Sequence, residues 1–161
     1  MRQRDEEFHR FVAERSAALL RLAYLLCADR GLAEDVLQNA LVKGYLRWPR
    51  IASNPEAYLR RVIVTTVADE RRRPWRREMP AAEVPDRPDP AEPYSGVEVR
   101  AQLLQALAAL PPRQRAAVVL RHWVGLDPDS VAELLGCSSG TVRSQTARGL
   151  DRLREAYGGV S

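Results

Sequence analysis

Apolar residues recur every three or four positions at both ends of the chain, which is the spacing of amphipathic helices rather than strands. In the N-terminal part this spacing predicts three helices. The first has about 20 residues and ends at Gly31, and the second is closed by Pro49. The third begins at Pro55, with Asn54 as its N-cap, and stops at Pro74. Their stripes contain Phe8, Phe11, Val12, Leu19, Leu22 and Leu26, then Leu32, Val36, Leu37, Leu41, Tyr45 and Trp48, then Tyr58, Leu59, Val62, Ile63 and Val67.

The C-terminal part has the same helical spacing and ends in a helix-turn-helix pattern. The spacing predicts a first helix that is ended by Pro111 and Pro112, followed by a second helix over 113–124. It then predicts a short helix with Asp127 as N-cap that ends at Gly136, and a basic helix from Ser138 or Ser139 to about residue 157. A short helix, a tight turn with glycine and a longer basic helix form the outline of a helix-turn-helix.

Between these parts lies a segment that cannot be helical. Residues 79–97 hold five of the 11 prolines, and residues 78–98 hold six carboxylates against Arg87 alone, a local charge of −5. The sequence therefore predicts an all-α protein of two small helical domains joined by a Pro-rich acidic linker. We expect a first domain over 1–77, a flexible linker over 78–97 and a second domain over 98–161.

Size and composition exclude several classes of protein. The chain has 161 residues, too few for a large catalytic barrel. It has no apolar run of membrane-spanning length and no apolar segment at its start, so we expect a cytoplasmic protein without membrane insertion. Cys27 and Cys137 each fall in an apolar helical pattern, which favours buried thiols over a disulfide or metal site. No phosphate loop, metal cluster or nucleophile set is visible, so we expect no enzyme activity, metal or cofactor.

The positive charge is concentrated in two helical segments. Seven arginines against two carboxylates give residues 60–77 a local charge of +5, and four arginines against one carboxylate give residues 143–154 a charge of +3. Lys43 is the only lysine, so nearly every cation is a guanidinium, which makes forked contacts with phosphates and guanine edges. A basic run is often only a solvated helix face. Here the close packing of arginines favours a nucleic-acid backbone as partner.

The first basic segment also contains an aromatic residue. Trp75 either stacks on an unpaired base or covers the apolar side of the third helix. The last helix begins with hydroxyls and a glycine, where free N–H groups and the helix dipole can meet a phosphate, although an ordinary capped helix looks the same. We expect Val142 to face inward. The candidate DNA-binding residues are Arg60, Arg61, Thr65, Arg71, Arg72, Arg73 and Trp75 in the first segment, and Ser139, Thr141, Arg143, Ser144, Gln145 and Arg148 in the last helix.

Two stretches resemble bacterial sigma factors of the extracytoplasmic-function type, in the SigE-like actinobacterial group. Ala33–Leu41 (AEDVLQNAL) is similar to the segment of region 2 that binds the polymerase clamp. Leu110–Arg115 (LPPRQR), together with Gly140–Arg148 (GTVRSQTAR), is similar to region 4. Departures from the family pattern are Asn39, Thr65, Ala68 and Arg71, where Glu, Asn, Arg and an aromatic residue are frequent.

The resemblance implies an alternative sigma factor that binds core RNA polymerase and directs it to promoters. It implies that Asp35, Gln38, Leu41 and Tyr45 contact the core polymerase clamp. The helix from Pro55 to Arg73 would open and read the minus-ten element. Residues at the start of the last helix would read the minus-thirty-five element. The implied partners are core RNA polymerase, promoter DNA and, as in many members, an anti-sigma factor.

The length of the linker fits two separated DNA contacts. Nineteen residues of extended Pro-rich chain reach roughly 60 Å, about 17 base pairs of duplex. A tether of this kind also raises the effective concentration of the second contact. Whether the linker threads a basic channel or is a solvated spacer stays open from the sequence. The alternative functions are a stand-alone helix-turn-helix regulator, which would bind a palindromic duplex without polymerase, and a protein-interaction adaptor or sigma inhibitor, which would leave both basic segments unused.

Overall fold

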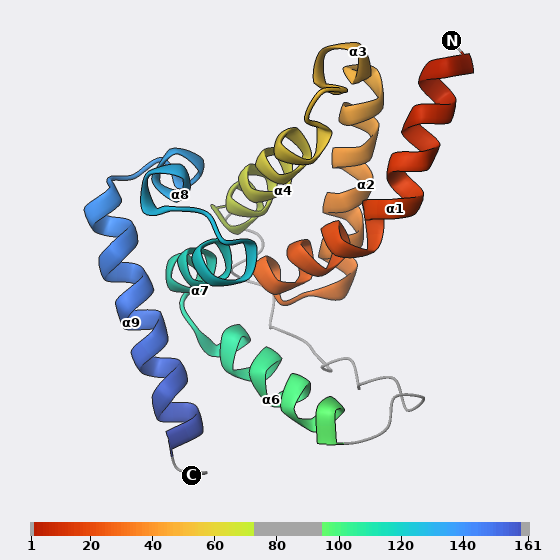
Figure 1. Cartoon of the computed structure of the whole chain (residues 1–161). Coiled ribbons are helices and arrows are strands. Elements are labelled where there is room, and N and C mark those ends of the chain that lie inside the picture. The colour runs from red at the N-terminus through yellow and green to blue at the C-terminus, as the bar shows by residue number, and fades with distance from the viewer. Residues whose placement is uncertain (1, 73–94, 159–161) are drawn as a thin grey trace. The chain divides into compact units, whose positions relative to one another are not determined.

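The computed structural model describes the backbone of residues 2–72 and 95–158, and the side chains of residues 2–70 and 101–156. Within these ranges every regular element is helical, which confirms the all-α prediction. The chain divides into two compact units, Met1–Arg76 (unit 1) and Arg77–Ser161 (unit 2), drawn in Figure 1. Most of the linker predicted over 78–97 lies outside the described residues.

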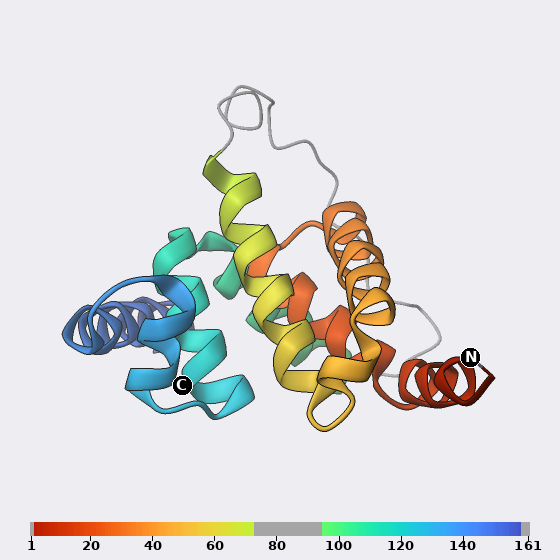
Figure 2. The ribbon, with the colours of Figure 1, turned by 90° about the horizontal axis from the view of Figure 1, so that it is seen from above.

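Unit 1 consists of α1 (Arg2–Cys27), α2 (Arg30–Leu46), the short α3 (Trp48–Ile51) and α4 (Pro55–Arg72). The predicted apolar stripes meet in its core, where α4 packs against both α1 and α2 (Figure 2). The fully buried side chains Leu59 and Ile63 of α4 lie at the centre, with Val36 of α2 nearly as deep. Burying a side chain of this size stabilises the fold by about 1.5–3 kcal/mol, so the core determines which face of each helix points outward.

The boundary between α1 and α2 differs from the sequence prediction. Helix α1 ends at Cys27, Ala28 adopts a left-handed backbone with φ 58°, and Asp29 is the N-cap of α2, whose carboxylate accepts a hydrogen bond from Leu32 N at 3.1 Å. The prediction that the first helix ends at Gly31 is therefore wrong, because Gly31 lies in the first turn of α2. An aspartate side chain can satisfy a free N–H at a helix start, so Asp29 rather than the glycine determines the boundary.

The predicted end of the second helix is also wrong. Helix α2 stops at Leu46, and Pro49 lies in the first turn of α3 rather than closing α2. A proline is tolerated in a first turn, since the missing N–H would have no partner there. The predicted start of α4 is confirmed: Asn54 Oδ1 accepts from Ala57 N at 3.3 Å, and Pro55 is the first helical residue. The predicted stop at Pro74 lies outside the described residues.

An aromatic cluster joins the start of α1 to the end of α2 and to α3. Phe8 packs edge-on against Tyr45 and Trp48, with ring centroids 5.2 and 5.6 Å apart. The Tyr45 hydroxyl donates to Asp5 Oδ1 at 2.6 Å, and Trp48 Nε1 donates to Glu7 Oε1 at 3.1 Å. The hydrogen bond to Asp5 is the main reason that the pKa of Tyr45 is raised above its ordinary value. The polar tips of both rings are thus satisfied while their apolar bodies stay packed.

Unit 2 begins with α6 (Ser95–Ala109) and continues through α7 (Pro112–Val118), the π-helical turn η1 (Val119–Val124), α8 (Pro128–Leu135) and α9 (Ser139–Gly158). Helix α6 starts inside the predicted linker, because the last proline of that segment is Pro93 and no other proline follows before Pro111.

The single helix predicted over 113–124 is two elements. It widens to a π-helix after Val118, and the chain leaves it through Gly125 at φ 87°. Arg121 holds the following loop by donating from Nη1 to Leu126 O at 2.8 Å. Periodicity does not distinguish an α-helix from a π-turn of this length, since both bury Val119 and Leu120.

Arg115 links α7 to the end of α6. Its side chain is only 4% exposed, and its guanidinium donates to the carbonyl oxygens of Leu107, Ala108 and Leu110 at 2.8 to 2.9 Å. The last carbonyls of a helix lack partners within the helix and carry partial negative charge, so this buried cation satisfies them. One cation of the chain is therefore structural and is not available to DNA.

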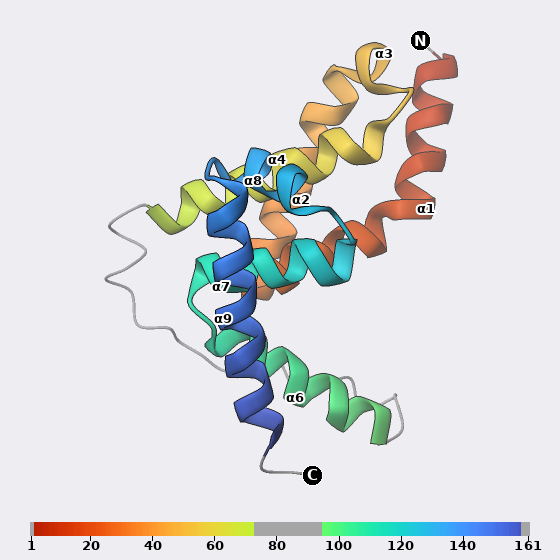
Figure 3. The ribbon, with the colours of Figure 1, turned by 60° about the vertical axis from the view of Figure 1, so that its left-hand side comes forward.

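Helix α9 crosses α7 at a glycine (Figure 3). A Cβ on Gly149 would lie 2.6 Å from Val118 Cγ2 and 3.3 Å from Gln114 O. Real Cβ contacts are not that short, so only glycine allows α9 to approach α7 this closely.

We predict that Gly149→Ala destabilises unit 2 by about 1–3 kcal/mol through overpacking at this crossing. The measurement is the unfolding transition of unit 2 in the full chain, followed by urea titration. Val118→Ala in the same chain makes room for the new methyl group, so the double variant is expected to lose less than the two single losses added together. An unchanged transition in Gly149→Ala contradicts the packing described here.

Candidate nucleic-acid and protein interfaces

The start of α9 is built by a hydroxyl cap. Ser138 Oγ accepts from Thr141 N at 3.1 Å and donates to Thr141 Oγ1 at 3.0 Å, which makes Ser138 the N-cap and Ser139 the first helical residue. Ser144 Oγ donates to Thr141 O at 3.1 Å one turn later. Two of the hydroxyls in the predicted phosphate-binding segment are therefore occupied in shaping the helix start.

The rotation of α9 is set by its buried side. Val142 is 1% exposed, as the sequence predicts, and Thr146 is buried with its hydroxyl donating to Val142 O at 2.7 Å. With these residues turned inward, Arg143, Ser144 and Arg148 are exposed. Ser144 and Arg148 lie one turn apart, and Arg143 lies beside Ser144 in the same turn, within the part of a recognition helix that meets base edges and phosphates.

Three of the predicted residues of α9 are less accessible. Ser139, Thr141 and Gln145 are half-buried, and the hydroxyl of Thr141 is engaged with Ser138. The sequence did not separate these residues from their exposed neighbours, because polar side chains occupy both positions.

Helix α8 and the turn before α9 complete the helix-turn-helix. The predicted N-cap is confirmed: Asp127 Oδ1 accepts from Ser130 N at 2.7 Å. This backbone hydrogen bond is the first cause that lowers the pKa of Asp127, followed by a contact with the Ser130 side chain. The predicted end of α8 is also confirmed, since Gly136 adopts a left-handed backbone with φ 70°.

The two cysteine thiols differ in burial: Cys27 is buried as expected, whereas Cys137, in the turn before α9, is only half-buried.

Helix α4 carries the other predicted DNA residues that the structure describes. Arg61 and Thr65 are exposed, and Arg60 is half-buried. Thr65 Oγ1 lies 2.9 Å from Arg61 O and 3.2 Å from Val62 O, so its hydroxyl bonds back to the preceding turn. The side chains of Arg71 and Arg72, and all of Arg73 and Trp75, lie outside the described residues.

The predicted polymerase contacts on α2 do not share one environment. Asp35 and Gln38 are exposed, Leu41 is half-buried, and Tyr45 is half-buried with its hydroxyl bonded to α1. The four residues therefore do not form one open face, and their contact with polymerase stays a prediction.

Sequence reasoning missed two exposed apolar residues on the outer side of α2. Val42 is 56% exposed and Leu46 is 67% exposed, among the most exposed large apolar side chains in the described part of the chain. Together with Asp35, Gln38 and Asn39 they form a row at three- and four-residue spacing, which we name the α2 face. The sequence does contain a sign of this exposure, because the apolar stripe of α2 is too wide for one buried side. Four apolar residues cannot all point inward, namely Leu41, Val42, Tyr45 and Leu46.

Two family models match the chain. The sigma-70 region 2 family matches residues 11–77, and the sigma-70 region 4 family matches residues 100–153. The chain is 42% identical over 153 residues to the RNA polymerase sigma-E factor of Streptomyces avermitilis, covering 92% of this chain and 84% of that protein. It is 41% identical to the RNA polymerase sigma-E factor of Streptomyces coelicolor, covering 92% and 85%.

A solved structure has the same fold. The sigma factor RpoE of Bartonella quintana, in complex with the anti-sigma factor NepR, has a TM-score of 0.74 at 23% identity and covers 94% of this chain and 96% of that one. The chain therefore belongs to the sigma-70 family of RNA polymerase sigma factors, in its extracytoplasmic-function group. It is an alternative sigma factor, a subunit that binds core RNA polymerase and directs transcription initiation at particular promoters.

None of the described helices combines the length and hydropathy that crossing a bilayer requires.

The lowered pKa of Asp127 predicts a pH-dependent cap on α8. A carboxylate with a depressed folded-state pKa stabilises the fold above its unfolded pKa of about 3.9, and this contribution disappears as the pH falls through the folded pKa. In Asp127→Asn the amide caps the helix without titrating. We expect the stability advantage of the native chain over this variant to be constant near neutral pH and to shrink below about pH 4. Urea titrations across this range measure the difference, and a pH-independent difference contradicts the assignment.

Proposed function

We propose that the two units of this sigma factor divide promoter recognition between them. Unit 1 binds core polymerase through the α2 face and reads the minus-ten element with α4, while unit 2 reads the minus-thirty-five element with α9. The observation that carries the proposal is the exposure of Arg143, Ser144 and Arg148 on α9, which follows from the burial of Val142 and Thr146. No bond is made or broken by the chain itself in this proposal, so we assign it no enzyme activity.

The chemistry of α9 suits a duplex. Two exposed guanidinium groups near the start of a helix can pair with phosphates or with guanine edges in the major groove. Ser144 donates its hydroxyl proton to Thr141 O, so its oxygen is left to accept a hydrogen bond from a base amino group. These contacts fix register and base preference together.

The chemistry of α4 suits a strand that has left the duplex. Arg61 is exposed beside Thr65, and the arginine-rich segment follows directly in sequence. Cations along a helix hold a single-stranded backbone without depending on its sequence. In this mechanism polymerase brings α4 to the minus-ten element, and the arginines retain the displaced strand once its bases unstack.

The α2 face combines apolar and polar contacts. Val42 and Leu46 offer apolar area that water solvates poorly, and Asp35 and Gln38 offer hydrogen-bond and charge partners beside it. An apolar centre with a polar rim is the composition of a protein interface. Such a face suits core polymerase, and we place the protein in the cytoplasm, where polymerase and promoter DNA meet.

An anti-sigma factor is a further proposed partner. The solved structures of similar fold include RpoE with NepR, and CnrH with the cytosolic domain of CnrY at a TM-score of 0.62 and 21% identity. We propose that a protein of this kind competes with polymerase for the α2 face. A pull-down from native extract, with and without membranes, tests for it, and recovery of polymerase alone contradicts this part of the proposal.

Transcription with purified components tests the proposed function. Core polymerase and the purified chain are mixed with a promoter library, and the chain alone is tested for duplex binding. Selective run-off transcripts that require both components support the proposal. Tight binding of the lone chain to a palindromic duplex, without selective transcripts, supports the stand-alone regulator instead.

We predict that Arg143→Ala lowers transcription from promoters selected in this way by about tenfold, because one bidentate base contact contributes about 1–3 kcal/mol. Core polymerase affinity is expected to be unchanged. Arg152→Ala is the matched control, since Arg152 is exposed on the same helix but lies more than two turns further along. Loss of transcription and polymerase binding together in Arg143→Ala contradicts the division of roles.

We predict that Leu46→Asp weakens binding to core polymerase by about tenfold or more, because it places a charge where an apolar side chain is to be buried. Fluorescence anisotropy of the labelled chain titrated with core polymerase measures this affinity. Ala13→Asp, at an exposed site on α1, is the control for an added surface charge. Equal affinities for the native chain and Leu46→Asp show that the α2 face is not the contact.

A further inference from the structure

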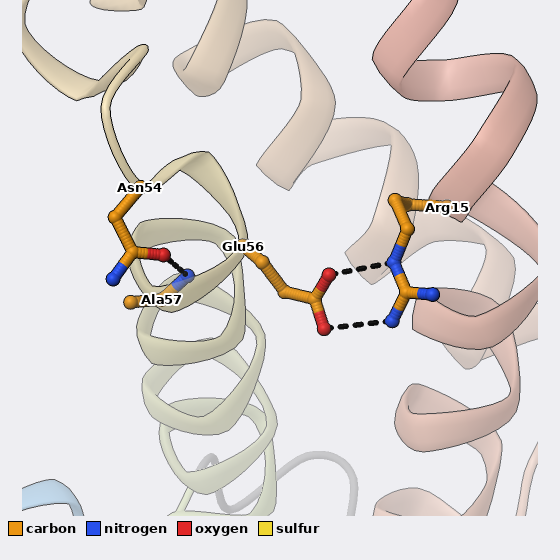
Figure 4. A network of polar contacts seen from close by, with 4 residues as sticks. All are labelled: Arg15, Asn54, Glu56 and Ala57. Atoms are coloured by element: carbon orange, nitrogen blue, oxygen red, sulfur yellow. Dashed lines mark hydrogen bonds and ion pairs between the residues drawn. The ribbon is translucent and has the colours of Figure 1, made fainter.

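One ion pair in unit 1 joins the middle of α1 to the first turn of α4, across 41 residues of sequence (Figure 4). Arg15 Nε donates to Glu56 Oε1 at 2.6 Å, and Arg15 Nη2 donates to Glu56 Oε2 at 2.7 Å. Both carboxylate oxygens and two guanidinium nitrogens take part, so the pair resists rotation as well as separation. Its hydrogen bonding to Glu56 is the first cause that raises the pKa of Arg15.

The carboxylate of this pair lies in the first turn of α4. Glu56 is the second helical residue, after the N-cap Asn54 and after Pro55, and a negative charge there faces the positive end of the helix dipole. Asn54 and Pro55 shape the start of the helix locally. Within the described residues, the two hydrogen bonds from Arg15 are the directional polar contacts that tie this first turn of α4 to α1.

Apolar packing holds α4 in a different way. Leu59 and Ile63 are fully buried and fix which face of α4 turns inward. Hydrophobic burial depends on area rather than direction, so it leaves small tilts of the helix start weakly opposed. The forked ion pair supplies a directional restraint at the end where α4 joins the turn of residues 52–54.

Resting on the function proposed above, we propose that Arg15 and Glu56 are positioning residues for minus-ten recognition. The pair fixes the start of α4 and the turn before it against α1, so that Arg61 and Thr65 meet the DNA strand in one position. Neither Arg15 nor Glu56 touches DNA in this account. The side chains are 42% and 35% exposed, and an ion pair this exposed contributes little to folding, so its removal leaves the fold and polymerase binding intact.

The test uses holoenzyme made from core polymerase and the full chain, on a promoter selected from the library described above. The variants are Arg15→Gln, Glu56→Gln and the charge-reversed double variant R15E/E56R. The readouts are core polymerase affinity, open-complex formation followed by a fluorescent base analogue in the minus-ten element, and transcription from a panel of minus-ten substitutions.

Each single variant is expected to slow open-complex formation about threefold to fivefold, the range that the coupling of a half-exposed pair allows. Each is also expected to flatten the preference across the minus-ten panel, with core affinity and the unfolding transition unchanged. The double reversal is expected to recover part of the rate and the preference. Recovery is partial because an arginine at position 56 meets the positive end of the helix dipole.

Asp151→Asn is the matched control. It removes the ion pair between Asp151 and Arg154 on α9 and is expected to leave the minus-ten panel unchanged. The positioning proposal is overturned if the single variants keep native rates and preferences, or if their losses follow polymerase affinity or folding stability. Thr65→Ala and Arg61→Ala distinguish failure of the positioning proposal from failure of the proposed role of α4. If these two variants alter the minus-ten panel while the ion-pair variants do not, only the positioning proposal fails. If none of the variants alters the panel, the proposed role of α4 fails.

Discussion

The burial of one apolar side per helix is the constraint on which the functional faces depend. Val142 of α9 is 1% exposed and Thr146 is also buried, and these inward residues leave Arg143 and Arg148 exposed. The same holds in unit 1, where the buried Leu59 and Ile63 leave Arg61 and Thr65 on the outer side of α4. The core sets the rotation of both helices, because burial of each large apolar side chain outweighs any single surface contact.

Polar interactions then refine what the core leaves undetermined. Four helices begin at a residue whose side chain caps them, namely Asp29, Asn54, Asp127 and Ser138. Gly149 sets how closely α9 approaches α7. Among the arginines whose side chains the structure describes, Arg115 is the buried one, and it holds the end of α6. These local contacts define where the helices begin and how closely they pack within each unit.

Features with a local cause could be predicted from the sequence. The caps at Asn54 and Asp127, the turn at Gly136 and the inward side of α9 all depend on a few neighbouring residues, and all are confirmed. The errors came where tertiary packing or competing local signals decide. Asp29 prevailed over Gly31 as the helix boundary, and the chain widened into a π-turn after Val118. The exposure of Val42 and Leu46 was missed for a different reason: an apolar side chain on an interface has the same pattern as one in a core.

In the proposed mechanism the two units contact separate promoter elements, and α4 reaches its element only when core polymerase brings it there. Photocrosslinking in the holoenzyme tests it most directly, with a reactive side chain at Thr65 on α4 or at Ala147 on the outer side of α9. The account predicts that position 147 crosslinks to duplex DNA at the upstream element, that position 65 crosslinks to the opened strand at the downstream element, and that the second product requires core polymerase. Crosslinks from both positions to one site, or equal yields without polymerase, contradict it.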